Sequence, residues 1–156
     1  MNKLLKLLAS IVFCEGVGLL GAVFTIPSIT TWYLYLNKPI FNPPNWIFGP
    51  VWTMLYLLMG VSLFLLLEKQ LKKQKNFLVA LFSIQLFLNF LWSVVFFGWH
   101  FPVWALVDIM LLWLSIALLI VDFWKFSKQA SLMLIPYLLW VSFASILNLS
   151  IVILNP

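Results

Sequence analysis

The chain has very few residues that carry charge or conventional catalytic chemistry. Of its 156 residues, four are acidic, one is a histidine and one is a cysteine. The single Cys14 excludes an internal disulfide and a multi-cysteine metal site. His100 falls in a tight turn at 98–102, where a structural role is far more common than ligation of a haem iron. No Cys–His or Ser–His arrangement suits nucleophilic catalysis, so we expect no metal site and no required cofactor, and enzymatic activity stays undecided.

Apolar residues, by contrast, make up 65% of the chain against 8% charged residues, and the mean hydropathy is +1.12. A soluble domain is nearer half apolar and a quarter charged, so this is the composition of a membrane protein. The first apolar run follows a basic start and lacks a small-x-small cleavage site, which predicts an uncleaved span. We expect an all-α membrane protein, one domain over residues 1–156, with five transmembrane helices at about 4–24, 46–67, 77–98, 102–124 and 130–154.

The lysines are divided unequally between the two ends of this predicted bundle. Eight fall at the N-terminus and in the 68–76 and 125–129 loops, which five spans place on one side, and only Lys38 falls on the other. By the positive-inside rule the N-terminus is cytoplasmic and the C-terminus lies outside. The net charge of +5 indicates topology and contact with lipid headgroups, and nucleic acid is not an expected partner. The eight are Lys3, Lys6, Lys69, Lys72, Lys73, Lys75, Lys125 and Lys128.

The long connection at about 25–45 is rich in proline and aromatic residues. Loops of about 20 residues in compact proteins are usually functional or disordered, and this composition argues against disorder. We therefore expect an ordered lid over the outer mouth of the bundle. Pro50 is expected either to delay the second regular helix until about Phe48 or to bend it. Pro136 is expected to loosen the fifth helix.

Several polar residues fall at depths where they must face the bundle interior. Gln85 and Asn89 share a face of the third span and are either helix–helix contacts or ligand contacts. Asp108 either tethers a loop or contacts a ligand. Glu15 is either protonated or paired with a lysine from the cytoplasmic side, and its role is not assigned. Small residues at i, i+4 spacing on the first span allow close approach of a bundle helix or a second protomer; they are Ser10, Cys14, Gly18 and Ala22.

The nine tryptophans fall into two groups by depth. Those near span ends fit the aromatic belt of a membrane interface: Trp32, Trp46, Trp99, Trp104 and Trp124. Deeper in the bundle are Trp92, Trp113 and Trp140, with Trp52 beneath the predicted lid. Facing indoles inside a bundle form a flat-walled apolar pocket with a few N–H donors, suited to a large aromatic ligand. Ordinary core packing is the alternative for each of them.

These residues occur in a pattern that is similar to a known family. The chain resembles the TspO family, the tryptophan-rich sensory proteins related to the mitochondrial translocator (peripheral benzodiazepine receptor), and within it a bacterial member. The resemblance extends over essentially all five spans in order. It is carried by Trp32-Tyr33, Lys38-Pro39, Pro43-Pro44, Trp46, the run F-G-P-V-W-T at 48–53, Tyr56, Met59-Gly60, L-N-F-L-W at 88–92, F-F-G at 96–98, W-A-L-V-D at 104–108, Pro136-Tyr137-Leu138, Trp140 and Leu147-Asn148.

This resemblance implies a five-helix bundle, commonly a homodimer, in the bacterial cell membrane. It implies binding of a tetrapyrrole such as protoporphyrin IX, binding of isoquinoline carboxamide and benzodiazepine-type drugs, and in some members light- and oxygen-dependent breakdown of the porphyrin. Trp52 and Trp140 are the indoles implied to lie against the tetrapyrrole and to take part in any photo-oxidation. The other residues implied to line the cavity are Tyr33, Pro43, Tyr56, Asn89, Phe90 and Ala144.

One departure from the family and two alternative functions follow from the residues. The end of the fifth span, 147–156, lacks the tyrosine and basic residue of the cholesterol-recognition pattern in the animal proteins, so specific cholesterol binding is not expected. A porphyrin transporter is one alternative, although the chain has no repeated halves. A ligand-dependent sensory or regulatory protein is the other, although the short cytoplasmic loops leave little docking surface.

Overall fold

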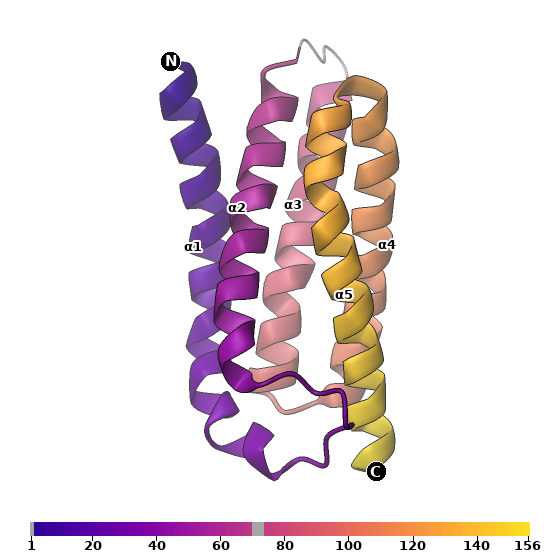
Figure 1. The fold of residues 1–156 in the computed structure, drawn as a ribbon. Coiled ribbons are helices and arrows are strands. Elements are labelled where there is room, and N and C mark those ends of the chain that lie inside the picture. The colour runs from indigo at the N-terminus through magenta and orange to yellow at the C-terminus, as the bar shows by residue number, and fades with distance from the viewer. Residues whose placement is uncertain (1, 70–73) are drawn as a thin grey trace.

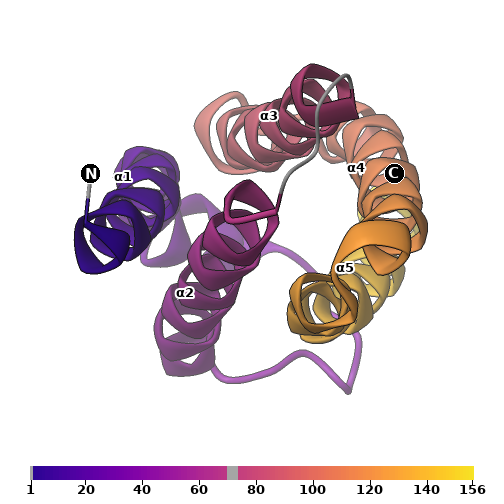
Figure 2. The ribbon, with the colours of Figure 1, turned by 90° about the horizontal axis from the view of Figure 1, so that it is seen from above.

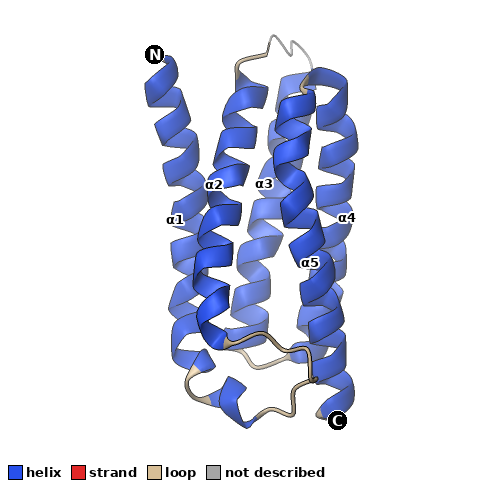
Figure 3. Cartoon of the chain, in the orientation of Figure 1, coloured by secondary structure: helices blue, strands red, loops and turns tan. Residues whose placement is uncertain are grey.

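The computed structural model describes residues 2–69 and 74–156, and within them every regular element is helical (Figures 1 and 3). Five helices are long and apolar enough to cross a membrane, which confirms the predicted fold class. The chain is thus an integral multi-pass membrane protein. The helices are α1 (Lys3–Ile29), α2 (Phe48–Leu67), α3 (Gln74–Ser93), α4 (Pro102–Phe126) and α5 (Lys128–Leu154), with 3-10 turns η1 (Trp32–Tyr35) and η2 (Asn45–Ile47) and a π-helical turn η3 (Val94–Gly98).

The helices form a ring in the order α1, α2, α5, α4, α3, as the view along the bundle shows (Figure 2). Successive helices run in opposite directions, so the two chain ends lie at opposite ends of the bundle (Figure 1). We call the end with the N-terminus the inner end, and the end with the α1–α2 loop and the C-terminus the outer end. The predicted inner-end residues Lys72 and Lys73 lie outside the described residues.

Two predicted boundaries are wrong by several residues. Helix α1 continues to Ile29 rather than ending near residue 24, and Pro27 falls in its last turn, where its missing N–H leaves out the bond to the Val23 carbonyl just before the helix ends. The hydroxyls of Thr30 and Thr31 donate to the Pro27 carbonyl and help to end the helix. The predicted 125–129 loop is a single residue, Ser127, whose hydroxyl caps α5 by accepting from the Ala130 N–H at 3.3 Å.

The prolines of α2 and α5 occupy different positions in their helices. Pro50 is the third residue of α2, which begins at Phe48, so its missing N–H is one that a first turn leaves unpaired in any case. Pro136 lies well inside α5, and α5 nevertheless continues as one helix to Leu154.

The inner half of the bundle is closely packed. A Cβ added to Gly60 of α2 would lie 2.6 Å from the Ile11 Cα of α1, so the two backbones are in contact there. The Ser62 hydroxyl donates to the Ala130 carbonyl at 2.7 Å and joins α2 to α5. Stacked rings of Phe82 and Phe123, 6.4 Å apart, fill the space between α3 and α4. These contacts fix the helices at the end away from the long loop.

The α1–α2 loop is held by its own side chains and by the C-terminus. The Lys38 ammonium donates to the carbonyls of Tyr33, Leu34 and Leu36 at 2.6, 3.2 and 3.0 Å. The Tyr33 hydroxyl donates to the Asn42 side chain at 2.6 Å, and burial raises the pKa of Tyr33 to about 12. Asn37 and Asn155 exchange two hydrogen bonds of 2.9 Å, which tie the loop to the end of α5.

Candidate functional site

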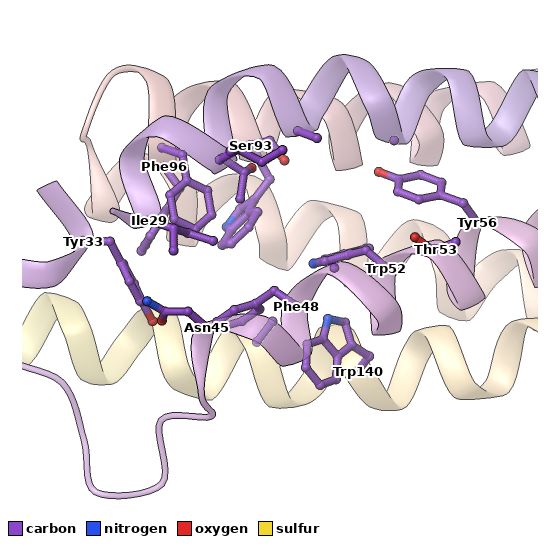
Figure 4. A pocket seen from close by; sticks show the side chains of 18 of the residues that line it. Ile29, Tyr33, Asn45, Phe48, Trp52, Thr53, Tyr56, Ser93, Phe96 and Trp140 are labelled. Atoms are coloured by element: carbon purple, nitrogen blue, oxygen red, sulfur yellow. The ribbon is translucent and has the colours of Figure 1, made fainter. Parts of the chain in front are cut away.

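A cavity of about 440 Å³ occupies the outer half of the bundle (Figure 4). Its walls come from α1, α2, η3 with the end of α3, and the outer half of α5, and the α1–α2 loop contributes Tyr33 and Asn45 at the mouth. The volume lies within the usual range for sites that bind drug-sized molecules. Because the inner half of the bundle is packed, the cavity ends near the middle of the spans.

Aromatic side chains form the wall between α2 and α5. The indoles of Trp52 and Trp140 meet edge to face, with ring centres 6.5 Å apart at 88°. Phe48 lies edge-on to Trp140 at 6.2 Å and extends this wall toward the mouth. In Figure 4 the ring nitrogens of both indoles point toward the cavity. The Trp140 Nε1–H is buried and has no hydrogen-bond acceptor among the described residues, so it is a donor that a ligand can use.

The cavity also reaches the membrane-facing surface between α1 and α2. Leu19 and Ile26 of α1 line it although each side chain is about two-thirds exposed, at 69% and 67%. Thr53 of α2 also lines the cavity and is exposed. An apolar ligand therefore has a lateral opening in addition to the mouth beneath the loop.

Tyr56 closes the inner end of the cavity. Its ring packs directly on Gly18 of α1, and any side chain at position 18 would overlap it. Its hydroxyl donates to the Asn89 side-chain oxygen, and the Asn89 amide donates to the Tyr137 hydroxyl at 2.6 Å. Three helices, α2, α3 and α5, are thereby joined behind the floor by buried polar groups that satisfy one another.

Glu15 is the one charged residue among those that line the cavity, and it lies beside the Tyr56 floor. Among the described residues it makes no hydrogen bond and no ion pair. The lysines of the inner end that were expected as partners are engaged elsewhere: Lys6 pairs with Glu68 at 2.8 Å and Lys3 approaches the same carboxylate at 3.8 Å. The hydrogen bond from Lys6 lowers the pKa of Glu68, which lies beyond the end of α2. The lysine-paired interpretation of Glu15 is therefore not supported.

The structure brings together five of the eight residues expected to contact ligand. They line the cavity and are Tyr33, Trp52, Tyr56, Trp140 and Ala144. Asn89 does not line it, because it lies behind Tyr56 as a contact between helices. Phe90, one residue further along α3, points in another direction and packs against Phe24 of α1 at 6.2 Å. Pro43 lies in the loop outside the lining, where its carbonyl accepts from Asn42.

Of the other residues singled out from the sequence, Trp46 and Trp92 also line the cavity, and four others do not. Trp113 donates to Ser142 at 2.8 Å and does not reach the cavity. Gln85 is buried against Met59, with its Nε2 3.9 Å from the sulfur. Asp108 is buried on α4, away from the cavity. His100, at a φ of 59°, stacks on Trp32 at 4.4 Å, which joins the α3–α4 turn to the loop.

Several lining residues were not anticipated from the sequence. Phe96 and Phe97 lie in η3, where the wider π-helical turn brings two successive phenylalanines into the bundle. The small-residue stripe on α1 was a partial signal, because Gly18 and Ala22 do line the cavity and Gly18 packs against α2 of the same bundle. Further lining residues without a sequence signal are Thr25, Ile29 and Ser93, whereas Phe48 belongs to the run at 48–53 that carried the family resemblance.

Comparisons with known proteins agree with this architecture. The model of the TspO/MBR family matches residues 10–154. The chain is 49% identical to the tryptophan-rich protein TspO of Chlorobaculum tepidum, over 100% of both chains, and 47% identical to that of Archaeoglobus fulgidus, over 98% of this chain and 99% of the other. It is also 36% identical to the translocator protein of Bos taurus, over 84% of this chain and 79% of that protein. This chain therefore belongs to the TspO/MBR family.

Proposed function

We propose that this protein binds a tetrapyrrole such as protoporphyrin IX in the outer-half cavity, with the ring against Trp52 and Trp140. The observation that carries the proposal is the edge-to-face indole pair, which gives the cavity an aromatic wall beneath the loop. Flat aromatic ligands gain stacking and burial energy from such a wall. The lateral opening between α1 and α2 leaves room for one edge of a large ring and gives an apolar ligand access from the bilayer.

Cavity charge supports one orientation of the ring. No basic residue among residues 2–69 and 74–156 lines the cavity, so the two carboxylates of protoporphyrin IX would lack a partner inside it. The mouth is a more suitable place for these carboxylates. Lys38 is the only charged residue in residues 25–47, and the loop contains no acid. The ring would enter with its apolar edge first and keep its carboxylates near the loop.

We further propose that the wall formed by Trp52 and Trp140 promotes light-dependent breakdown of the bound porphyrin. A bound porphyrin absorbs visible light and is itself the photosensitiser and the molecule oxidised, while dissolved O₂ is the oxidant. The protein would hold the ring against oxidisable indoles in a site from which most water is excluded. No residue of the cavity is needed as a conventional acid, base or nucleophile in this scheme.

Titration with protoporphyrin IX, followed by quenching of tryptophan fluorescence, tests the binding. We expect Trp52→Phe and Trp140→Phe to weaken binding about three- to tenfold, because each loses part of an aromatic contact. Trp113→Phe, which alters a tryptophan outside the cavity, is the matched control and should leave the affinity within about twofold. Equal affinities for all four proteins would contradict the proposed site.

Illumination of the same samples tests the photochemistry. The porphyrin Soret band should fade faster with wild type than with free porphyrin in the same detergent, and the two cavity variants should slow that loss. Equal breakdown in all samples would remove the photochemical role and leave the binding proposal intact.

The family resemblance also supports proposals about drug binding, oligomeric state and cholesterol. We expect isoquinoline carboxamide and benzodiazepine-type drugs to compete for the cavity, a homodimer to form in the membrane, and specific cholesterol binding to be absent. The lysine distribution supports a cytoplasmic inner end, which we propose for a bacterial cell membrane. Labelling of single cysteines introduced at the two ends in intact cells would establish the orientation.

A further inference from the structure

The inner end of the cavity differs in polarity from the rest of its wall. On α1 the lining begins at Glu15 and on α2 it ends at Tyr56, so these two residues mark the deepest level of the cavity. Gly18, one turn from Glu15 on the same face of α1, is in direct contact with the Tyr56 ring. The Glu15 side chain therefore lies at the floor of a cavity whose other described lining residues are uncharged.

The Glu15 carboxyl group has no protein partner to satisfy it. Within residues 2–69 and 74–156 no cation pairs with it and no donor bonds to it, since Lys3 and Lys6 contact Glu68 instead. The Tyr56 hydroxyl beside it donates to Asn89. An ionisable group at this depth of a membrane is costly unless it faces a cavity or a partner, and such residues commonly mark binding sites.

A lysine lies near the opposite end of the site. The Lys38 ammonium is held 4.9 Å from the centre of the Tyr33 ring, and Tyr33 itself lines the cavity at the mouth. A positive group thus lies in the loop beside the mouth, outside the lining, and a carboxyl group lies at the floor. A ligand with its acidic groups at one edge and hydrogen-bond donors at the other matches this arrangement, whereas the reverse orientation places carboxylates beside Glu15.

We propose that Glu15 recognises a hydroxyl or amine group on the edge of the ligand that enters the cavity first. This inference rests on the proposed function, because it assigns a preference among porphyrins to the same cavity. Protoporphyrin IX carries apolar vinyl groups on the edge away from its carboxylates and leaves Glu15 unsatisfied. Haematoporphyrin carries hydroxyethyl groups at those positions and offers it a donor. Porphyrins hydroxylated on this edge are therefore the better ligand class.

Paired titrations with haematoporphyrin and protoporphyrin IX test the assignment. For each protein, the dissociation constant of protoporphyrin IX is divided by that of haematoporphyrin. This ratio is then compared between variants, because the different partitioning of the two porphyrins into detergent affects all variants equally. One hydrogen bond to the Glu15 carboxyl group should make this ratio favour haematoporphyrin by about fivefold in wild type relative to Glu15→Leu. Val12→Thr, a lipid-facing change on the same helix, should keep the wild-type ratio.

A second variant separates loss of recognition from loss of structure. Glu15→Gln is nearly isosteric and keeps a neutral acceptor, so its ratio should fall below that of wild type while its affinity for protoporphyrin IX is retained. Unchanged ratios in both Glu15 variants would overturn the role of Glu15 while leaving porphyrin binding established. Failure of wild type to bind either porphyrin would instead overturn the proposed function, and the assignment with it.

Discussion

The two halves of the bundle are built from the same five helices but are packed in different ways. In the inner half, glycine and serine bring helices into direct contact, as at Gly60 against Ile11 and Ser62 against the Ala130 carbonyl. In the outer half, α1 stands away from α5, and aromatic rings line the space between them without filling it. The difference indicates that the inner half holds the helices in place, so that the outer half can keep a cavity open.

Substitution of Gly60 should test the close packing of the inner half with the largest effect on stability. Gly60→Ala places a Cβ 2.6 Å from the Ile11 backbone, which cannot move aside as a side chain could, and overpacking of this kind costs about 1–3 kcal/mol. Gly16→Ala is the matched control, because nothing lies within 4 Å of its added Cβ and alanine favours the helix by up to about 1 kcal/mol. Thermal denaturation in detergent should show a lower midpoint for the first and an equal or higher one for the second. Equal midpoints would contradict close packing at Gly60.

The hydrogen bonds of Asn89 to Tyr56 and Tyr137, at the boundary between the halves, should give the next largest effect on stability. Asn89→Leu leaves the hydroxyls of Tyr56 and Tyr137 without their partner and should cost about 1–3 kcal/mol. Ser83→Ala is the control, since that hydroxyl is exposed and bonds only within its own helix. The same denaturation assay measures both. A stable Asn89→Leu protein with unchanged porphyrin affinity would show that these hydrogen bonds do not support the cavity floor.

Loss of the hydrogen bonds between Asn37 of the loop and Asn155 at the end of α5 should increase mobility in the outer half only. Asn155→Ala removes the side-chain bonds to Asn37, each worth about 1 kcal/mol, and should free the loop. Hydrogen exchange of the amides in residues 30–44 should then accelerate about fivefold, while exchange of the inner-half helices stays as in wild type. Acceleration throughout the bundle would mean that the two halves are not independent.

Ionisation of Tyr33 gives the smallest predicted effect. Because burial raises the pKa of Tyr33 to about 12, the phenol keeps its proton in the folded loop where an exposed tyrosine would lose it. This residue therefore opposes folding only as pH rises from about 10 to 12 and has no pH-dependent effect below that range. The tyrosinate absorbance of wild type minus that of Tyr33→Phe should titrate near 12. A difference titrating near 10 would show that the ring is exposed.

Some parts of this structure could be predicted from the sequence, because their cause is local. Apolar runs of sufficient length fix the five spans, and the depth of Trp52 and Trp140 along them places both indoles under the loop. The rotation of each helix about its axis is not local, and there the prediction failed. Asn89 and Phe90 are neighbours in sequence, yet one contacts Tyr56 and Tyr137 while the other faces Phe24 on α1.

The remaining differences come from contacts that no sequence pattern reports. The π-helical turn that brings Phe96 and Phe97 into the bundle has no residue signature. Glu15 was recognised as unusual, but its place at the cavity floor depends on how α1 packs against α2. That packing is set at Gly60, where α2 meets the Ile11 backbone of α1, and at Gly18, where the Tyr56 ring lies directly on α1.

A structure of the protein with protoporphyrin IX bound tests the central claim most directly. The account predicts that the ring lies in the outer-half cavity against Trp52 and Trp140, with its carboxylates toward the α1–α2 loop and the inner half of the bundle unchanged. A ring bound on the lipid-facing surface of the bundle, outside this cavity, would contradict it.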